Sequence, residues 1–168
     1  MENNVRRSAR TRAIVAGGLI VGVLDALDAL VAYKLAFGMT PVTIYQFVAS
    51  GLLGQAAYSG GAGTALLGLA IHFLIAFTAA ALFVLGSERL PQLRRDAVGW
   101  GLAYGLVVFA VMSFGVIPLS RIPPSTPSLP LLLNGLVGHA LLVGLPISLA
   151  ARRFLGGAQR SAPARAAA

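Results

Sequence analysis

The chain has 168 residues, of which 57% are hydrophobic and only 11% are charged, and its mean hydropathy is +0.83. These values exclude a soluble globular domain, whose surface must be more polar, and a disordered chain, which cannot carry such long apolar runs. The 13 basic residues outnumber the 5 acidic ones. In so apolar a chain this excess indicates orientation in a membrane rather than binding of nucleic acid. The composition therefore predicts an integral membrane protein.

Four apolar runs are each long enough to cross a hydrocarbon core of roughly 30 Å as a helix. They cover residues 13–37, 62–85, 97–118 and 129–151. Helices are expected rather than strands, because the runs lack the alternation of barrel strands and because a helix satisfies its own backbone in lipid. We expect one transmembrane domain, residues 13–155, folded as an antiparallel bundle of four helices. A basic segment, residues 1–12, precedes it, and residues 156–168 form a small, basic tail that we expect to be disordered.

The positions of the basic residues predict the orientation of these spans. All but two of the 13 lie near the termini or between the second and third runs, and the two exceptions are Lys34 and Arg121. The positive-inside rule therefore places both termini in the cytoplasm, where the arginines would meet anionic headgroups. The first run begins like a secretory signal peptide, but it continues past Asp25 to Phe37, so we expect an uncleaved span.

A short amphipathic helix is predicted at residues 41–58, between the first and second spans. Thr40 and Pro41 form a typical helix start, and Thr43, Gln46 and Ser50 follow helical spacing along one polar side. We expect this helix to lie on the outer interface or to re-enter the bundle without crossing it. A cysteine at Ser50 is then expected to react with an impermeant reagent on the outer side.

Small residues line one face of several spans, which favours close packing of helices. The glycines expected at helix contacts are Gly18, Gly22, Gly68, Gly101, Gly105 and Gly135. Ionisable side chains lie among these small residues, with Asp25, His72 and His139 at a common depth of about 12–15 Å below the outer surface. Asp28 lies one turn nearer the outside. The candidate proton or ion cluster comprises Asp25, Asp28, His72, Asn134 and His139.

Two interpretations of this cluster remain open. Ionisable groups inside a membrane are functional by default, which favours a proton-carrying or ion-coordinating site and hence proton-linked transport or permeation by an oligomer. Alternatively, an Asp25–histidine contact holds the helices in register, and the protein is a scaffold or accessory subunit. A third reading is a haem held by His72 and His139. No catalytic motif indicates an enzyme, and no other cofactor is expected. The absence of cysteine excludes disulfides and thiolate chemistry.

Several short motifs of the second half resemble those of the uncharacterised YagU-like bacterial inner-membrane proteins. They are Ile71-His72-Phe73, Leu90-Pro91, Ile117-Pro118-Leu119 and Gly138-His139. The resemblance covers about Gly68 to Arg153. It implies a four-span protein of the bacterial cytoplasmic membrane and supplies no established binding or catalytic residue.

Overall fold

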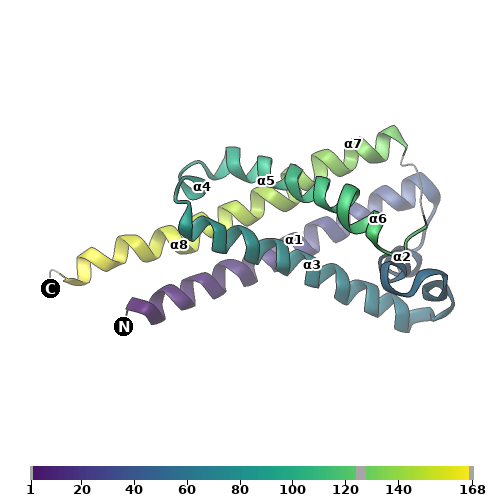
Figure 1. The fold of residues 1–168 in the computed structure, drawn as a ribbon, viewed down its shortest axis with the longest axis horizontal. Helices are drawn as coiled ribbons and strands as arrows, with labels where there is room; N and C mark the ends of the chain where they lie inside the picture. Colours follow the sequence, from purple (N-terminus) through teal and green to yellow (C-terminus); the bar gives the residue numbers. More distant parts are fainter. Residues whose placement is uncertain (1, 124–127, 167–168) are drawn as a thin grey trace.

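Four long apolar helical segments form the protein, which we describe from a computed structural model covering residues 2–123 and 128–166, with side chains for residues 3–123 and 128–156. The candidate membrane spans are Asn3–Phe37, Gly61–Arg89, Ala97–Leu119 and Leu129–Gly156. Figure 1 shows them side by side along the long axis of a bundle, with successive spans in opposite directions and both termini at one end. The predicted four-span helical fold is confirmed. We call the end with both termini the terminal end, and the opposite end the α2 end.

Two of the spans are continuous helices and two are built from several segments. The first span is α1 (Glu2–Phe37) and the second is α3 (Gly61–Arg89). The third span consists of α5 (Ala97–Val111), η2 (Met112–Val116) and α6 (Ile117–Leu119), and the fourth of α7 (Leu129–Gly138), η3 (His139–Gly144) and α8 (Leu145–Ala166). A single turn, α4 (Gln92–Arg95), links α3 to α5 at the terminal end.

At the terminal end, helix continues beyond the apolar runs. The basic segment that precedes the first run is part of α1, and its Arg10 pairs with Glu88 of α3 at 2.9 Å between Nη2 and Oε2. Helix α8 continues in helical backbone to Ala166, past Gly156, where the sequence predicts that the ordered bundle ends. The disorder expected for residues 156–168 stays a prediction, and residues 167 and 168 lie outside the described residues.

The segments η2 and η3 are π-helical, and each lies just before a proline. Met112–Val116 precedes Pro118, and His139–Gly144 precedes Pro146. A proline within a helix removes one N–H donor, and its ring clashes with the carbonyl four residues earlier. A wider π turn at that place moves the displaced carbonyl aside, so both helices pass their prolines without ending.

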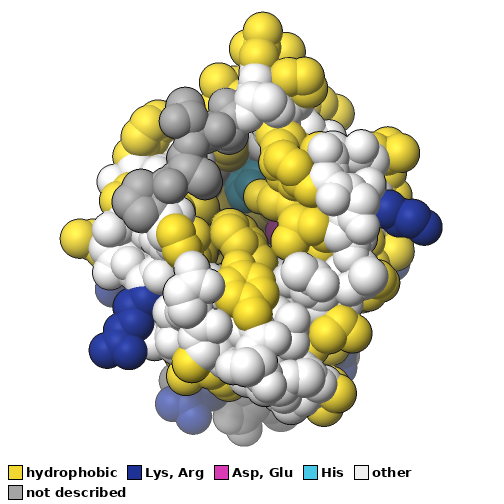
Figure 2. Space-filling model, turned by 90° about the vertical axis from the view of Figure 1, so that its right-hand side faces the viewer, with side chains coloured by type: hydrophobic (Ala, Val, Ile, Leu, Met, Phe, Trp, Pro, Cys, Tyr) yellow, Lys and Arg dark blue, Asp and Glu magenta, His cyan; other side chains and the backbone are white. Residues whose placement is uncertain are grey.

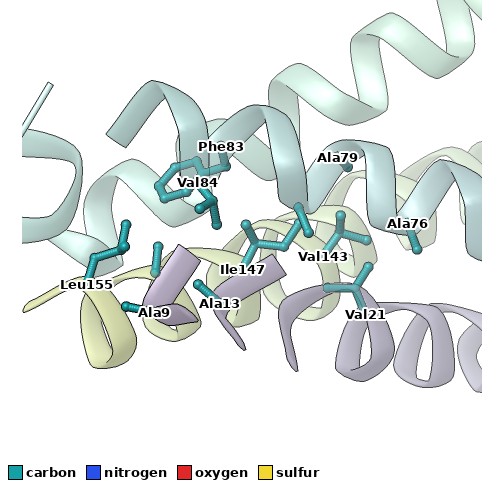
Figure 3. Close-up of a cluster of buried hydrophobic side chains, with 12 residues drawn as sticks. Ala9, Ala13, Val21, Ala76, Ala79, Phe83, Val84, Val143, Ile147 and Leu155 are labelled. Carbon is teal, nitrogen blue, oxygen red and sulfur yellow. The ribbon is translucent and has the colours of Figure 1, made fainter. Parts of the chain in front are cut away.

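The hydrophobic core fills the terminal half of the bundle, where α1 packs against α3 and α8, and α5 packs against α8. Small side chains dominate it, which lets the helices approach closely in the absence of a strong hydrophobic driving force in lipid. Figure 3 shows this core along α1, α3 and the fourth span. We call the following twelve residues the core cluster: Ala9, Ala13, Val21, Ala76, Ala79, Ala80, Phe83, Val84, Val143, Ile147, Ala151 and Leu155.

The short helix predicted between the first two spans is present as α2 (Pro41–Leu53), which is followed by a 3₁₀ turn, η1 (Gly54–Ser59). Thr40 caps α2, as predicted, because its hydroxyl accepts a hydrogen bond from the Thr43 amide at 3.2 Å. Gly54 and Gly61 take positive φ angles of 60° and 57°, which turn the chain back into α3 without the strain that a Cβ would cause.

The direction of the polar side of α2 differs from the expectation. Gln46 and Ser50 are buried, with exposed fractions of 6% and 0%, whereas Leu52 is 59% exposed. The Gln46 amide donates to the Gly61 carbonyl at 3.0 Å, and the Ser50 hydroxyl donates to the Phe47 carbonyl at 2.7 Å. The expected reactivity of a cysteine at Ser50 is therefore wrong. Because the outer surface of a membrane bundle faces lipid, the polar residues of α2 turn inward to find partners.

This arrangement predicts opposite reactivity for two serine-to-cysteine variants. Ser50→Cys should resist an impermeant maleimide in the folded protein, because Ser50 is fully buried, whereas Ser59→Cys on exposed η1 should react readily. The chain has no cysteine of its own, so each variant reports a single site. Mass spectrometry of the labelled protein measures the modified fraction. Equal labelling of the two variants under native conditions would contradict the buried position of Ser50.

Candidate functional site

A histidine of α3 is bonded directly to the backbone of α1. The Nε2 atom of His72 lies 2.8 Å from the Gly22 carbonyl oxygen. A carbonyl oxygen can only accept, so Nε2 carries the proton in this hydrogen bond. Close approach of the two helices makes the bond possible, because a side chain at Gly22 would collide with the ring of Phe73. The small residue thus serves the contact, and the imidazole is held in one tautomer and one orientation.

The other nitrogen of the same imidazole faces an acid. The Nδ1 atom of His72 lies 3.9 Å from Oδ2 of Asp25, which is one turn along α1 from Gly22. The two side chains keep exposed fractions of 14% for His72 and 27% for Asp25. The structure thus brings together two of the five residues in the candidate cluster. The lone pair of Nδ1 and the carboxylate of Asp25 can therefore bind a proton between them.

A second polar pair joins α1 to α7. The Asn134 amide donates to Oδ2 of Asp28 at 2.8 Å, across 106 residues of sequence. Gly138 lies beside the same carboxylate, since a Cβ at this position would come within 3.1 Å of Oδ2. Asp28 therefore has a partner of its own on the fourth span. Its carboxylate is separate from the Asp25–His72 pair.

His139 is placed differently from His72. Its Nδ1 atom lies 2.9 Å from the Gly135 carbonyl of its own helical turn, and its ring packs edge-on against Phe109 at 5.5 Å between centroids. Among the described residues, no hydrogen bond or ion pair joins His139 to either aspartate. Within the same residues no group of three or more His, Cys, Asp or Glu side chains could hold a metal ion.

Helix α2 covers the Asp25–His72 pair from the α2 end. The Tyr45 ring lies edge-on to the His72 ring, with centroids 6.4 Å apart. Burial raises the pKa of the Tyr45 phenol, and the nearby charge of Asp25 raises it further. The phenol therefore stays protonated through the physiological range. Gly68 lets α2 lie this close to α3, because a Cβ there would overlap the Tyr45 carbonyl.

The remaining glycines of the predicted helix contacts also face neighbouring helices. Gly18 lies under the ring of Phe77, and Gly135 lies under the ring of Phe109. Gly101 and Gly105 of α5 meet the fourth span, where a Cβ at Gly105 would overlap the His139 carbonyl. These two glycines, which form a GxxxG pattern, are thus occupied by a contact within the bundle.

A hollow opens at the α2 end of the molecule. Figure 2 views this end directly and shows apolar side chains around a depression, with a histidine and an acidic side chain visible at its floor. The acidic residues other than Asp25 and Asp28 are Glu2 at the start of α1, Glu88 at the end of α3 and Asp96 just before α5, and these three positions are all at the terminal end. The acid at the floor is therefore one of the two aspartates of α1.

Fold and polar interior together define a four-span helical membrane protein with paired acid, amide and imidazole groups in the half of the bundle next to α2. Comparison with protein-family models, with curated proteins and with solved structures gives no match. The resemblance to the YagU-like proteins stays a prediction. Sequence reasoning did not identify the Gly22 carbonyl or Tyr45 as neighbours of His72. A backbone acceptor leaves no signal in the sequence, whereas Tyr45 could have been found from its place on the helix that follows α1.

Proposed function

We propose that the protein is a small proton-linked transport or permeation protein of a bacterial cytoplasmic membrane, and that Asp25 and His72 share the proton. The observation that carries this proposal is the orientation of the His72 ring. Its Nε2 is occupied by the Gly22 carbonyl at 2.8 Å, so its Nδ1 is directed to Asp25 at 3.9 Å. Hydrogen bonding of one nitrogen is the usual means by which a protein selects the nitrogen that exchanges protons.

The chemistry of the pair favours one bound proton. With both groups deprotonated, the lone pair of Nδ1 faces a carboxylate, which is repulsive and leaves a charge that costs roughly 2.5–3.5 kcal/mol at mid-membrane. One added proton gives either a neutral acid beside a neutral imidazole or a carboxylate beside an imidazolium. Both states have zero net charge, so the pair is best accommodated in the membrane when it holds a single proton. A group that gains and loses this proton can couple it to transport.

The distribution of arginines supports a cytoplasmic terminal end. Lys34 and Arg121 are the only basic residues outside the terminal end and its flanking segments. Burial lowers the pKa of Arg94 in α4; the charge of Arg6 also lowers it, whereas that of Glu88 raises it. Arg89, Arg94 and Arg95 also lie close together in the sequence at this end, and clustered arginines favour contact with anionic headgroups. The bilayer is the partner for which the helices are suited, and we expect several copies to assemble, because four spans rarely enclose a pathway.

Proton flux in reconstituted proteoliposomes tests the proposal. After a pH jump, a trapped pH indicator should report faster equilibration with the parent protein than in protein-free liposomes. Asp25→Asn should return the rate to that of protein-free liposomes, because the amide keeps the size of the carboxyl group but cannot take up a proton. His72→Gln should do the same. Asp28→Asn is the matched control, since Asp28 is paired with Asn134, and it should retain most of the flux.

The alternative role as a scaffold makes the opposite prediction. A structural Asp25–His72 contact requires no flux above that of protein-free liposomes, and Asp25→Asn should then alter only stability. Flux that is equal in the parent protein and in Asp25→Asn would show that protons take another route. The haem reading is less well supported by the geometry, because the Nε2 atom of His72 is already bonded to Gly22.

A further inference from the structure

The polar pairs and the hydrophobic core occupy different halves of the bundle. Three members of the core cluster, Val21, Ala76 and Val143, lie one helical turn from Asp25, His72 and His139, respectively, and always on the side of the terminal end. The core therefore begins one turn from each of these three groups, toward the terminal end. From there it continues without a break to Ala9 and Leu155 near the terminal end (Figure 3).

The polar side chains within the terminal half offer no path through this core. Ser87 and Ser148 are fully buried, and their hydroxyls donate to the carbonyls of Val84 at 2.8 Å and of Ala97 at 2.6 Å. The Tyr104 hydroxyl donates to the Ala79 carbonyl at 2.8 Å. Each of these hydroxyl protons is held by a backbone acceptor, and among the described residues no buried side-chain nitrogen or oxygen lacks a partner. A chain of water or hydroxyl groups would need such free groups.

The opposite half is open. The hollow at the α2 end leads to a histidine and an acidic side chain (Figure 2), and both Asp25 and His72 retain exposed surface. The hydrogen bond from Tyr104 to the Ala79 carbonyl and the contact between the rings of Tyr104 and Phe83 join α5 to α3. Both contacts lie in the terminal half, so these two helices contribute to the asymmetry.

We infer that, in this conformation, the Asp25–His72 pair exchanges protons with water on the α2 side alone, and that the core cluster closes the route to the terminal side. The inference rests on the proposed function in treating the pair as the proton site. Passage of a proton across the membrane then requires the core to open in a second conformation. The structure corresponds to one side of an alternating-access cycle and not to a continuous pore.

Single-cysteine variants test this one-sided access. A small, impermeant quaternary-ammonium methanethiosulfonate reacts only with thiols that water reaches. Ser59→Cys on η1 and Ser8→Cys on α1 are both exposed and identify which membrane face is the α2 side and which is the terminal side. His72→Cys places the reporter at the pair itself. Asn134→Cys places a second reporter on the fourth span beside Asp28, in case the first variant does not fold.

Reagent on the face that labels Ser59→Cys should also label His72→Cys and Asn134→Cys. Reagent on the face that labels Ser8→Cys should leave both unmodified. Comparable labelling from both faces would overturn the inference, as would labelling from neither face, since the hollow would then not hold water. One-sided labelling in a protein without proton flux would uphold the access route and refute only the transport function. Proton flux together with labelling from both faces would uphold the transport function and refute the one-sided access.

Discussion

Gly144→Ala should lower the stability of the bundle substantially, whereas Gly86→Ala should not. At Gly144 an added Cβ would overlap the Gly101 carbonyl and come within 2.6 Å of the Gly105 Cα. These neighbours are backbone atoms of α5, which cannot rotate aside as a side chain can. The two helices must therefore separate, and overpacking of this kind typically costs about 1–3 kcal/mol. The loss should be at the upper end of that range, because the Ser148–Ala97 hydrogen bond crosses the same interface.

Gly86 is the matched control because it is also a helical glycine in a span, and a Cβ there meets nothing within 4 Å. Alanine favours the helix over glycine by up to about 1 kcal/mol, so Gly86→Ala should be neutral or slightly stabilising. Thermal unfolding in detergent, followed by circular dichroism, compares the two variants with the parent protein. Similar unfolding temperatures for both variants would show that α5 and the fourth span are not in backbone contact at Gly144.

Gly68→Ala should release α2 from the bundle while leaving the four spans assembled. The added Cβ would overlap the Tyr45 carbonyl and lie 3.1 Å from the Ala49 amide nitrogen, so α2 cannot keep its place against α3. Release removes the Tyr45 ring from His72 and exposes the buried side of α2. The effect is local, because α2 contributes no residue to the core cluster.

Ser50→Cys provides the readout for this release. In the parent background the thiol is expected to be protected, and in the Gly68→Ala background it should react with an impermeant maleimide at a rate close to that of Ser59→Cys. Gly63→Ala, on the same helix and with nothing within 4 Å of its Cβ, is the control that should keep Ser50→Cys protected. Protection that persists in the Gly68→Ala background would mean that α2 can shift without leaving α3.

The number and type of spans could be predicted from the sequence because they depend on one property, the length of uninterrupted apolar runs. The cap of α2 was also predictable, because a threonine before a proline is a local signal. The environment of α2 could not be predicted from the sequence. Helical spacing shows that Gln46 and Ser50 share a side, but in a membrane the polar side can turn to water or to other helices. Only the packing of α2 against Gly68 decides between these two orientations.

The polar pairs show the same limit. Depth along the helices and the small residues around Asp25 and His72 indicated that helices meet at these positions. Which groups would bond could not be derived. The acceptor for His72 is a backbone carbonyl, which is present at every residue, and rotation of the fourth span by a fraction of a turn would change which of its side chains faces Asp28. The sequence therefore predicted the neighbourhood of the polar groups, but not their pairing.

The third span differs from the first in what it requires for insertion into the membrane. Only 6% of its most apolar stretch is buried inside the bundle, and residues 97–119 contain no Asp, Glu, Lys, Arg or His. Such a helix is stable in lipid by itself and needs no partner to leave the translocon. The first span, by contrast, carries Asp25 and Asp28 into the membrane, and their partners, His72 and Asn134, are present only after α3 and α7 have been synthesised. During biosynthesis, insertion and assembly are thus separate events for the third span, whereas the first must wait for its neighbours before its aspartates are paired.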